Sequence, residues 1–383
     1  MKIVADENIA AVEEYFGDIG ELVLAPGRQI DSALLRDADV LLVRSVTRVD
    51  ERLLRGSSCR YVGTATSGID HMDTDFLTKA GIGFSAARGC NAEAVCDYVF
   101  SALAALSCQP STHWTARSIG IVGCGEVGSR LAARCINLGM ELAIHDPLLA
   151  PDHPMGALLD NYEKVLASDI VTFHTPLTKR GAFPTYHMLG ARELRLLDRQ
   201  ATIINAARGA VVDNAALLHW LQLNEDATVV LDVWEGEPAI LPGLLEQVSL
   251  GTPHIAGYSL EGRLNGTRMI HQALCRYLQI PCKLINPCSD DLPAIPGAGS
   301  LDDLILSACD IRRDDAALRM AASGPQPEVA FDQLRKNYPH RREFSACTMA
   351  FGDLDDLVRK QAQALGFRFS FPGTHPENVP AGA

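Results

Sequence analysis

Short apolar runs alternate with helical patterns along most of this chain. In residues 1 to about 90, the strand-like runs are Lys2–Ala5, Glu21–Leu24, Asp39–Val43, Tyr61–Gly63 and Ile82–Phe84. Helical stretches lie between them, for example Thr74–Ala80, which Gly81 closes. Strands that alternate with helices in this way predict a parallel sheet with helices on both faces.

The same alternation resumes after a long apolar helix, predicted over Ala92–Leu106, and a polar linker. The later strand-like runs are Ile119–Val122, Leu142–Ile144, Asp169–Phe173, Thr202–Asn205, Thr228–Leu231 and Val248–Leu250. They predict a second doubly wound parallel sheet. Because such sheets bind ligands beyond the carboxyl ends of their strands, the polar residues that follow these runs are the candidates for function.

A third region follows the two sheets. A helix predicted over Leu260–Leu278 returns to the first domain, and several prolines between 281 and 296 mark a boundary. Beyond it, helices at 328–338 and 353–365 and a strand at 367–371 indicate a small α+β domain, with a polar tail from Pro372. We therefore expect an α/β chain with a discontinuous first domain (1–92 and 259–285), a second domain (93–258) and a small C-terminal domain (286–383).

Composition narrows the class of protein. The 383 residues are too many for one ordinary domain. The net charge of −13 argues against a nucleic-acid partner, because phosphate contacts need a basic face. We find no pattern of a membrane span or a signal peptide. The eleven cysteines are scattered without a CxxC pair, which predicts reduced packing residues in a cytoplasmic protein without a metal site.

A glycine-rich turn carries the clearest chemical signal. Gly123, Gly125 and Gly128 stand between the run Ile119–Val122 and a helical pattern over Ser129–Leu138. This is the position of a dinucleotide-binding fingerprint, in which the glycines permit a tight turn, close approach of a pyrophosphate and close packing of the helix. The N–H groups of Glu126 and Val127 would then face the phosphates.

An acidic residue at the end of the next strand selects the dinucleotide. Asp146 follows Leu142–Ile144 and His145, where a carboxylate can accept both hydroxyls of the adenosine ribose and repel a 2′-phosphate. Pro147 follows it, and no arginine is adjacent to hold such a phosphate. This part of the sequence predicts NAD rather than NADP in a Rossmann domain.

Three later strand ends supply an arginine, a glutamate and a histidine: Arg208, Glu237 and His254. Oxidation of a secondary alcohol by hydride transfer needs these types, namely a base for the proton, a carboxylate that orients the base, and a cation that polarises the oxygen. Each also has an ordinary interpretation. Arg208 could pair with Asp213, Glu237 could be a solvated turn residue, and His254 could be a loop histidine with satisfied hydrogen bonds. Ser45 and Thr66, after two strands of the first domain, could likewise be turn or capping residues.

Longer runs resemble a known family. The chain is similar to the D-isomer-specific 2-hydroxyacid dehydrogenases in the runs GIVGCGEVG (120–128), NAARGAVVD (205–213), LDVWEGEP (231–238) and TPHIAG (252–257). The resemblance covers residues 1 to about 280 and implies that Arg208, Glu237 and His254 are catalytic. Further runs resemble the branch of this family that acts on 4-phospho-D-erythronate: LLVRSVTRVD (41–50), YVGTATSGIDHMD (61–73), GCNAEAVCDYV (89–99) and HIAGYSLEGR (254–263).

The resemblance also implies further roles for single residues and regions. Substrate contacts would come from Ser45, Thr66 and Tyr258. NAD contacts would come from Asp146, Thr175, Ala206, Ala207, Arg208, Asp232 and Gly257, in addition to the glycine-rich turn. The first domain would be a flavodoxin-like substrate domain, and the C-terminal domain would join two chains into a homodimer.

The reaction that the resemblance implies is NAD-dependent oxidation of 4-phospho-D-erythronate to 2-oxo-3-hydroxy-4-phosphobutanoate in pyridoxine biosynthesis. Two alternatives remain open at this point: a dehydrogenase of 3-phosphoglycerate or another D-2-hydroxyacid, and a non-enzymic NAD-binding regulator of the same fold. The residues that bind the distal phosphate have no motif. We expect Arg44, next to Ser45, to contribute, because a chain of net charge −13 needs a local positive group for such a ligand.

Overall fold

The computed structural model describes residues 1–107, 113–150, 152–283, 285, 294–295, 299–350 and 354–370. The chain divides into two compact units, one of Met1–Ala92 with Ser259–Asp291 and one of Glu93–Tyr258 with Leu292–Ala383. The predicted boundary at residue 286 and the predicted polar tail from Pro372 lie outside the described residues.

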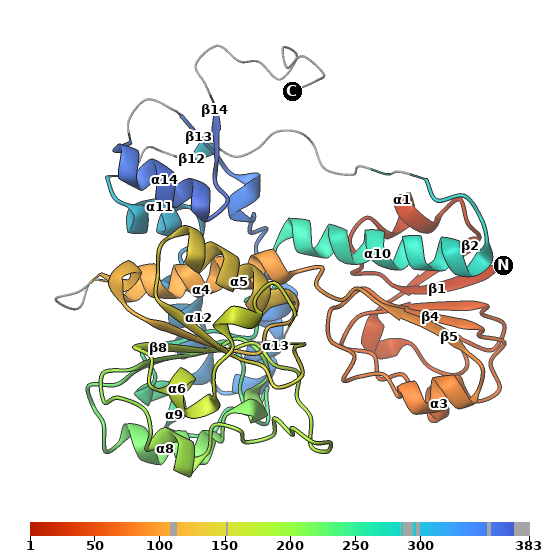
Figure 1. Ribbon diagram of the computed structural model, residues 1–383. Coiled ribbons are helices and arrows are strands. Elements are labelled where there is room, and N and C mark those ends of the chain that lie inside the picture. Colours follow the sequence, from red (N-terminus) through yellow and green to blue (C-terminus); the bar gives the residue numbers. More distant parts are fainter. Residues whose placement is uncertain are drawn as a thin grey trace. The chain divides into compact units, whose positions relative to one another are not determined.

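The first unit is built on a parallel five-stranded sheet in the order β2-β1-β3-β4-β5. Its strands are β1 (Lys2–Asp6), β2 (Glu21–Ala25), β3 (Val40–Val43), β4 (Tyr61–Thr64) and β5 (Gly83–Ala86), and its helices are α1 (Val12–Phe16), α2 (Glu51–Leu54), α3 (Thr74–Lys79) and α10 (Leu260–Leu278). The long helix α10 runs along one face of the sheet beside α1, and α3 lies on the opposite face (Figure 1). The central strands β3 and β4 are buried throughout, which explains why β3 is apolar throughout and β4 is largely so.

The second unit contains a six-stranded parallel sheet in the order β11-β10-β9-β8-β6-β7. Its strands are β6 (Ile119–Val122), β7 (Leu142–His145), β8 (Ile170–Phe173), β9 (Thr202–Asn205), β10 (Thr228–Leu231) and β11 (Leu250–Gly251), and its helices are α4 (Ala92–Leu106), α5 (Glu126–Asn137), α6 (Tyr162–Leu166), α7 (Ala191–Leu194), α8 (Asn214–Leu221) and α9 (Leu244–Gln247). The strand order reverses at β6, which pairs with both β7 and β8. Such a reversal opens a crevice for a ligand at the carboxyl ends of the strands. The prediction of two doubly wound parallel sheets is confirmed.

The C-terminal region adds helices and a small parallel sheet to the second unit. The helices are α11 (Leu301–Ala308), α12 (Arg312–Ala322), α13 (Pro327–Lys336) and α14 (Asp356–Ala364), and the sheet has the order β12-β13-β14 with strands Ala294–Ile295, Thr348–Ala350 and Arg368–Ser370. The sequence patterns predicted α13, α14 and β14 with slightly longer bounds. They did not predict α11, α12, β12 or β13.

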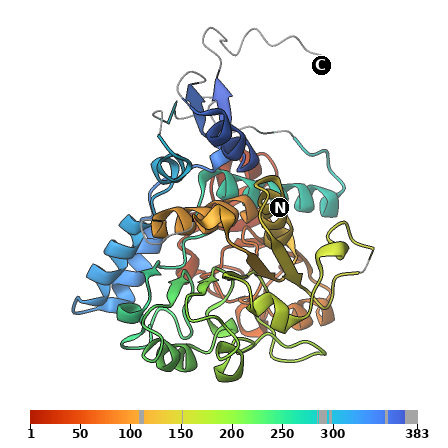
Figure 2. The same ribbon diagram turned by 60° about the vertical axis from the view of Figure 1, so that its left-hand side comes forward.

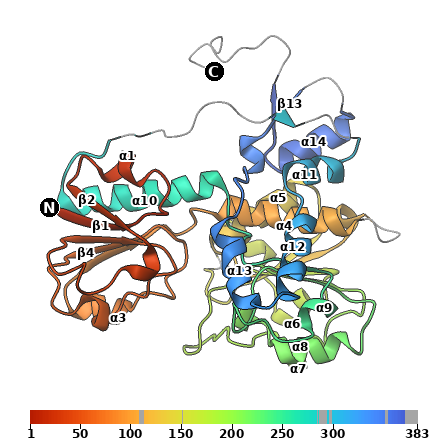
Figure 3. The same ribbon diagram turned by 180° about the vertical axis from the view of Figure 1, so that it is seen from behind.

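Helix α12 closes the edge of the second sheet at β11 (Figures 2 and 3). The Asp315 carboxylate accepts a hydrogen bond from Gly251 N at 2.7 Å. Arg319 donates to the carbonyl oxygens of Leu245 at 2.6 Å and Val248 at 2.9 Å. The strand begins at Leu250, two residues later than the predicted Val248.

The apolar core of the second unit continues into the C-terminal region. Leu318 of α12 and Phe331 of α13 are almost fully buried in the same cluster as Trp234 and the β9–β10 strands. The C-terminal region therefore covers apolar surface that the sheet would otherwise expose.

Within the described part of the chain, each helix is too short or too polar to span a membrane.

Candidate active site

The glycine-rich turn connects β6 to α5. Gly123 has a φ of +93°, in the left-handed region that favours glycine, and a Cβ there would lie 2.8 Å from the carbonyl oxygen of His174. A Cβ at Gly128 would lie 1.9 Å from the carbonyl oxygen of Gly123, so the helix packs directly on the turn. A Cβ at Gly125 would meet nothing within 4 Å, so the backbone there is open to a ligand. These surroundings fit a pyrophosphate at the N-terminus of α5.

Asp146 lies beside this turn, at the end of β7. Its Oδ2 atom accepts a hydrogen bond from Cys124 N at 2.8 Å, and its Oδ1 atom accepts one from Leu148 N at 3.0 Å. Each carboxylate oxygen can accept a further bond, so this anchored group retains capacity for ribose hydroxyls. The residues at this end of the sheet therefore fit NAD.

The loop that carries Arg208 follows β9, and the side chain of Asn205 forms hydrogen bonds with its backbone. Asn205 is fully buried, its amide donates to the Arg208 carbonyl at 3.0 Å, and its carbonyl accepts from Ala207 N at 3.1 Å. Gly209 then passes directly over Trp234, because a Cβ at Gly209 would lie 2.0 Å from the Trp234 carbonyl carbon. Only glycine fits at this crossing, which places the Arg208 loop against the strand end that leads to Glu237.

Glu237 and His254 form a hydrogen-bonded pair at the ends of β10 and β11. Oε1 of Glu237 bonds to Nδ1 of His254, while Oε2 accepts from Trp234 N at 3.1 Å. Burial raises the pKa of Glu237, but the neighbouring His254, the hydrogen bonds and the Arg335 guanidinium outweigh it, so the pKa lies below its ordinary value. Glu237 is thus a partner of the imidazole rather than a solvated turn residue.

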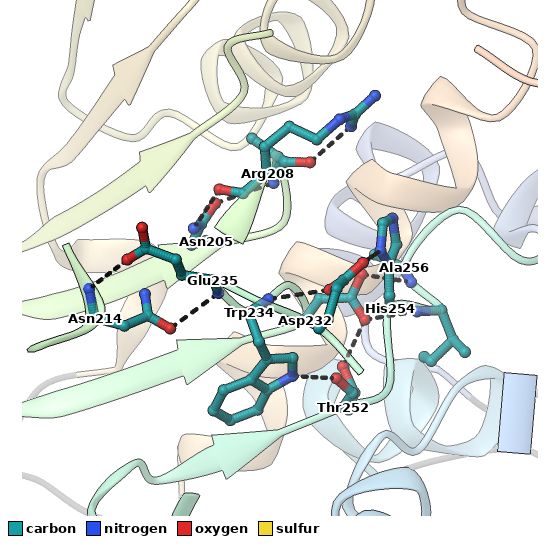
Figure 4. A network of polar contacts seen from close by, with 12 residues as sticks. Asn205, Arg208, Asn214, Asp232, Trp234, Glu235, Thr252, His254 and Ala256 are labelled. Atoms are coloured by element: carbon teal, nitrogen blue, oxygen red, sulfur yellow. Dashed lines mark hydrogen bonds and ion pairs between the residues drawn. The ribbon is translucent and has the colours of Figure 1, made fainter. Parts of the chain in front are cut away.

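Asp232 joins the strand end of β10 to the loop of His254 (Figure 4). Its carboxylate is buried and accepts hydrogen bonds from the Thr252 hydroxyl at 2.7 Å, Ile255 N at 2.7 Å and Ala256 N at 2.9 Å. The Thr252 hydroxyl also contacts the Tyr98 hydroxyl at 2.7 Å. Burial raises the pKa of Asp232 above its ordinary value, against the opposing effect of His254 and these donors.

Comparisons with known proteins identify the family. The family model of the D-isomer specific 2-hydroxyacid dehydrogenase NAD binding domain matches residues 105–256, and a domain family of unknown function matches residues 294–366. The erythronate-4-phosphate dehydrogenase of Cellvibrio japonicus is 44% identical over 386 residues, covering 96% of this chain and 100% of the relative. The chain belongs to the erythronate-4-phosphate dehydrogenase family. The enzymes of that name from Cronobacter sakazakii and Edwardsiella ictaluri are 45% and 46% identical to this chain. The alignments cover 98% and 96% of this chain, respectively, and 99% of each relative.

Solved structures share the fold at lower identity. The D-lactate dehydrogenase of Aquifex aeolicus, solved with NAD and lactic acid, aligns with a TM-score of 0.62 at 22% identity and covers 73% of this chain and 96% of that one. The NAD-bound 3-phosphoglycerate dehydrogenase of Entamoeba histolytica aligns with a TM-score of 0.63 at 21% identity, covering 75% and 99%. As a member of the erythronate-4-phosphate dehydrogenase family, the chain is an NAD-dependent 2-hydroxyacid dehydrogenase, as the resemblance implied.

In this dehydrogenase, the other predicted NAD residues also lie after strands of the second sheet. Thr175 follows β8, Ala206 and Ala207 follow β9, and Gly257 lies in the loop after β11. The second unit thus brings together the predicted dinucleotide site, Arg208 and the Glu237–His254 pair at one edge of its sheet. Which of them contact NAD stays a prediction.

The predicted substrate residues Ser45 and Thr66 belong to the first unit of the dehydrogenase. Ser45 is exposed in the turn after β3. The Thr66 hydroxyl lies 2.8 Å from that of Thr64 and donates to the Gly68 carbonyl at 3.0 Å, so it also has the turn chemistry of the ordinary interpretation. Arg44 Nε donates to Asp6 at 3.1 Å, and Asp6 is fully buried. Arg44 therefore has a structural partner, and its contact with a substrate phosphate stays a prediction.

The sequence patterns did not identify two neighbours of Tyr258, one aromatic and one cationic. Tyr338, just after α13, packs edge-to-face on the Tyr258 ring at 5.8 Å between centroids, and the Arg335 guanidinium lies 5.9 Å from the same ring centroid. No motif marks these residues, since charged side chains near the end of an amphipathic helix are typical of solvated faces. Asn205 was also missed, although its place at the end of β9 is a signal for a polar role.

Two clusters bring possible metal ligands within 4.8 Å of one another among the described residues. His187 lies between Glu235, at 2.8 Å, and Asp213, at 3.5 Å. The other cluster joins His271 to two thiols, Cys275 and Cys282, each at 3.6 Å. Within each cluster the side chains contact one another directly.

Proposed function

We propose that this dehydrogenase oxidises 4-phospho-D-erythronate at C2 to 2-oxo-3-hydroxy-4-phosphobutanoate, a step of pyridoxine and pyridoxal 5′-phosphate biosynthesis. The observation that carries this proposal is the Glu237–His254 pair beside the Arg208 strand end, in a chain that is 44% identical to a relative named for this substrate. The three residues follow β9, β10 and β11, which are neighbours in the sheet.

His254 acts in this proposal as the base that removes the proton of the C2 hydroxyl. Because Nδ1 of His254 is bonded to Glu237, Nε2 is the atom left to accept that proton. Glu237 holds the ring in the tautomer with a proton on Nδ1 and stabilises the imidazolium that forms. The lowered pKa of Glu237 supports this role, because the carboxylate stays charged at neutral pH.

Arg208 binds the substrate carboxylate and polarises the C2 oxygen as it becomes a carbonyl. A guanidinium can hold both groups with parallel hydrogen bonds. Its loop is fixed by Asn205 and by the crossing of Gly209 over Trp234, so the cation does not depend on a mobile backbone for its position.

NAD would be held by the turn from Gly123 to Gly128, by Asp146, and by the residues after β8, β9 and β11: Thr175, Ala206, Ala207, Arg208 and Gly257. When bound, NAD accepts the hydride from C2. The resemblance also implies an NAD contact for Asp232. Its three donors from Thr252, Ile255 and Ala256 support a different first role, which is to fix the loop of His254.

The first unit supplies the remaining substrate contacts in this proposal. Ser45 and Thr66, with Tyr258 from the second unit, would bind the hydroxyl and phosphate groups.

We also propose three functional domains, formed by residues 1–92 with 259–285, 93–258 and 286–383. The protein would act in the cytoplasm as a homodimer joined through the last of these domains. The exposed apolar side chains of Met320, Val329 and Leu357, which are 76%, 50% and 63% exposed, support an interface on the C-terminal region.

The experiment is a panel of hydroxy acids with NAD, followed by NADH absorbance. We expect 4-phospho-D-erythronate to give the highest kcat/KM, above 3-phosphoglycerate and D-lactate. His254→Ala should lower kcat by about 10²–10⁴-fold with little change in NAD affinity, because a general base contributes that much. His219→Ala, a histidine on α8, is the matched control. Preference for 3-phosphoglycerate would contradict the substrate, and near-normal turnover by His254→Ala would contradict the base.

A further inference from the structure

Arg335 brings a positive charge from the C-terminal region to the proposed active site. It lies in the last turn of α13, and its guanidinium carbon is 5.9 Å from the ring centroid of Tyr258. Tyr258 is four residues after His254 in the sequence. Tyr338 also packs edge-to-face on Tyr258. The Nε atom of Arg335 is sealed from solvent and has no hydrogen-bond partner among the described residues.

The acidic groups near Arg335 are already bonded to other donors. Both oxygens of Glu237 are used, one by His254 and the other by Trp234 N. The Asp232 carboxylate accepts from three donors of its own. Burial lowers the pKa of Arg335, but Tyr258, Glu237 and Asp232 outweigh it and raise the pKa, so the group is a permanent cation. A buried N–H without a partner costs free energy, so this guanidinium gains from a rearrangement that brings an acceptor to it.

We propose that Arg335 binds the phosphate group of the substrate, so that the C-terminal region supplies part of the active site and selects hydroxy acids phosphorylated at the end remote from the carboxylate. This inference rests on the proposed function. Arg208 serves the carboxylate end, and the distal phosphate needs a separate cation. A phosphate four bonds from C2 lies about 5 Å from it, which is compatible with a guanidinium close enough to influence Glu237.

Charge supports this assignment over Arg44. The chain carries a net charge of −13, so a phosphorylated ligand needs a local cation. Arg44 is paired with the carboxylate of the buried Asp6, whereas Arg335 has a hydrogen bond with the phenol of Tyr258 and an Nε atom without a partner among the described residues. A guanidinium also matches the geometry of a phosphate with two parallel donors, which a lysine does not.

The test compares Arg335→Met with Arg335→Lys and with Lys336→Met, a matched control at the next, exposed position of the same helix turn. Steady-state kinetics use full-length enzyme, NAD, and either 4-phospho-D-erythronate or D-erythronate. We expect Arg335→Met to raise the KM for the phosphorylated substrate at least 10-fold, to change the KM for D-erythronate less than 2-fold, and to leave kcat within about 3-fold. Arg335→Lys should recover part of the loss, and Lys336→Met should match wild type.

A second measurement uses inorganic phosphate as the probe, and it does not depend on turnover of the unphosphorylated acid. Phosphate should compete with 4-phospho-D-erythronate in wild type, and its inhibition constant should rise at least 5-fold in Arg335→Met but not in Lys336→Met. Equal losses on both substrates, or an unchanged inhibition constant, would overturn the proposal. A failure of the proposed function is distinguishable, because wild type itself would then show no preference for the phosphorylated acid.

Discussion

The backbone carbonyl of Asp232 accepts a hydrogen bond from His254 N at 2.7 Å. The Asp232 side chain meanwhile holds the next two N–H groups, those of Ile255 and Ala256. His254 itself has a φ of +56°, a left-handed conformation that costs an ordinary side chain about 1 kcal/mol. One buried aspartate therefore fixes, from inside the domain, the strained loop that presents the proposed base.

Replacing Asp232 should loosen this loop and destabilise the domain. Asp232→Ala leaves the Thr252 hydroxyl and two N–H groups buried without their acceptor, at about 1–3 kcal/mol each. We expect the free energy of unfolding in urea to fall by about 3 kcal/mol or more, and kcat to fall with it. Asp226→Ala, an exposed aspartate of the same unit, is the control. A loss no larger than that of the control would contradict the role of Asp232.

The crossing of Gly209 over Trp234 predicts a loss of catalysis from one added methyl group. In Gly209→Ala the new Cβ would lie 2.0 Å from the Trp234 carbonyl carbon, so the Arg208 loop must move. We expect at least a 100-fold lower kcat/KM, since a displacement of about 1 Å can cost that much. At Gly299 the nearest atom would be 3.9 Å away, so Gly299→Ala should behave as wild type. Normal activity of Gly209→Ala would show that the Arg208 loop does not depend on this contact.

Asp146 should determine the choice between NAD and NADP. Its carboxylate, anchored by Cys124 N and Leu148 N, would repel the 2′-phosphate of NADP. We expect Asp146→Asn to lower the ratio of kcat/KM for NAD to that for NADP by about tenfold, which corresponds to the loss of one like-charge repulsion of ~1.4 kcal/mol. Glu141→Gln, at the start of the same strand region, controls for a change in net charge. Equal use of both cofactors by wild type would contradict the interpretation.

Asp314 predicts a pH dependence of stability. Burial raises the pKa of Asp314 to about 6, and Tyr338 donates to this carboxyl at 3.2 Å. Since the folded state holds the proton more tightly than the unfolded chain, in which the pKa is about 3.9, stability falls as pH rises from about 4 to 6. Asp314→Asn keeps the acceptor for Tyr338 and should remove this fall, which amounts to at most ~3 kcal/mol.

The measurement is the difference in unfolding free energy between wild type and Asp314→Asn at pH 4.5 and at pH 7.5. The variant should gain relative to wild type at the higher pH. Asp310→Asn is the comparison, because hydrogen bonds from Arg312 lower the pKa of Asp310. Its contribution is lost only below about pH 4, so the difference between this variant and wild type should stay nearly constant between the two pH values. A pH-independent difference for Asp314→Asn would contradict the prediction.

The proposed homodimer is tested by sedimentation velocity of the full chain. We expect Met320→Asp and Leu357→Asp to shift a wild-type dimer towards monomer, because each places a charge on an exposed apolar side chain of the C-terminal region. Leu223→Asp, at a leucine that is 70% exposed just after α8, should leave the dimer intact. Truncation is a poorer test, because Leu318 and Phe331 belong to the core of the second unit. A monomeric wild type would contradict the proposal.

Local features of this chain could be predicted because their causes lie close together in sequence. The strand β3 is a continuous apolar run and β4 and β9 are largely apolar, since parallel strands are buried on both faces. The glycine-rich turn needs a tight turn, an open backbone and close packing within six residues, from Gly123 to Gly128, and the structure has all three. Residue types at strand ends likewise named Arg208, Glu237 and His254 as candidates.

Contacts between distant segments could not be predicted in this way. The sequence left Glu237 open to a solvated role, and only the pairing of β10 with β11 and the left-handed φ of His254 bring the two side chains into hydrogen-bond contact. Arg335 reaches Tyr258 because α12 and α13 pack on the edge and core of the second sheet, through Leu318 and Phe331. A helical pattern marks which residues of a helix are apolar, but not which surface they will cover. The local periodicity of the chain therefore determines its elements and nominates its reactive groups, whereas long-range packing decides which of these groups meet.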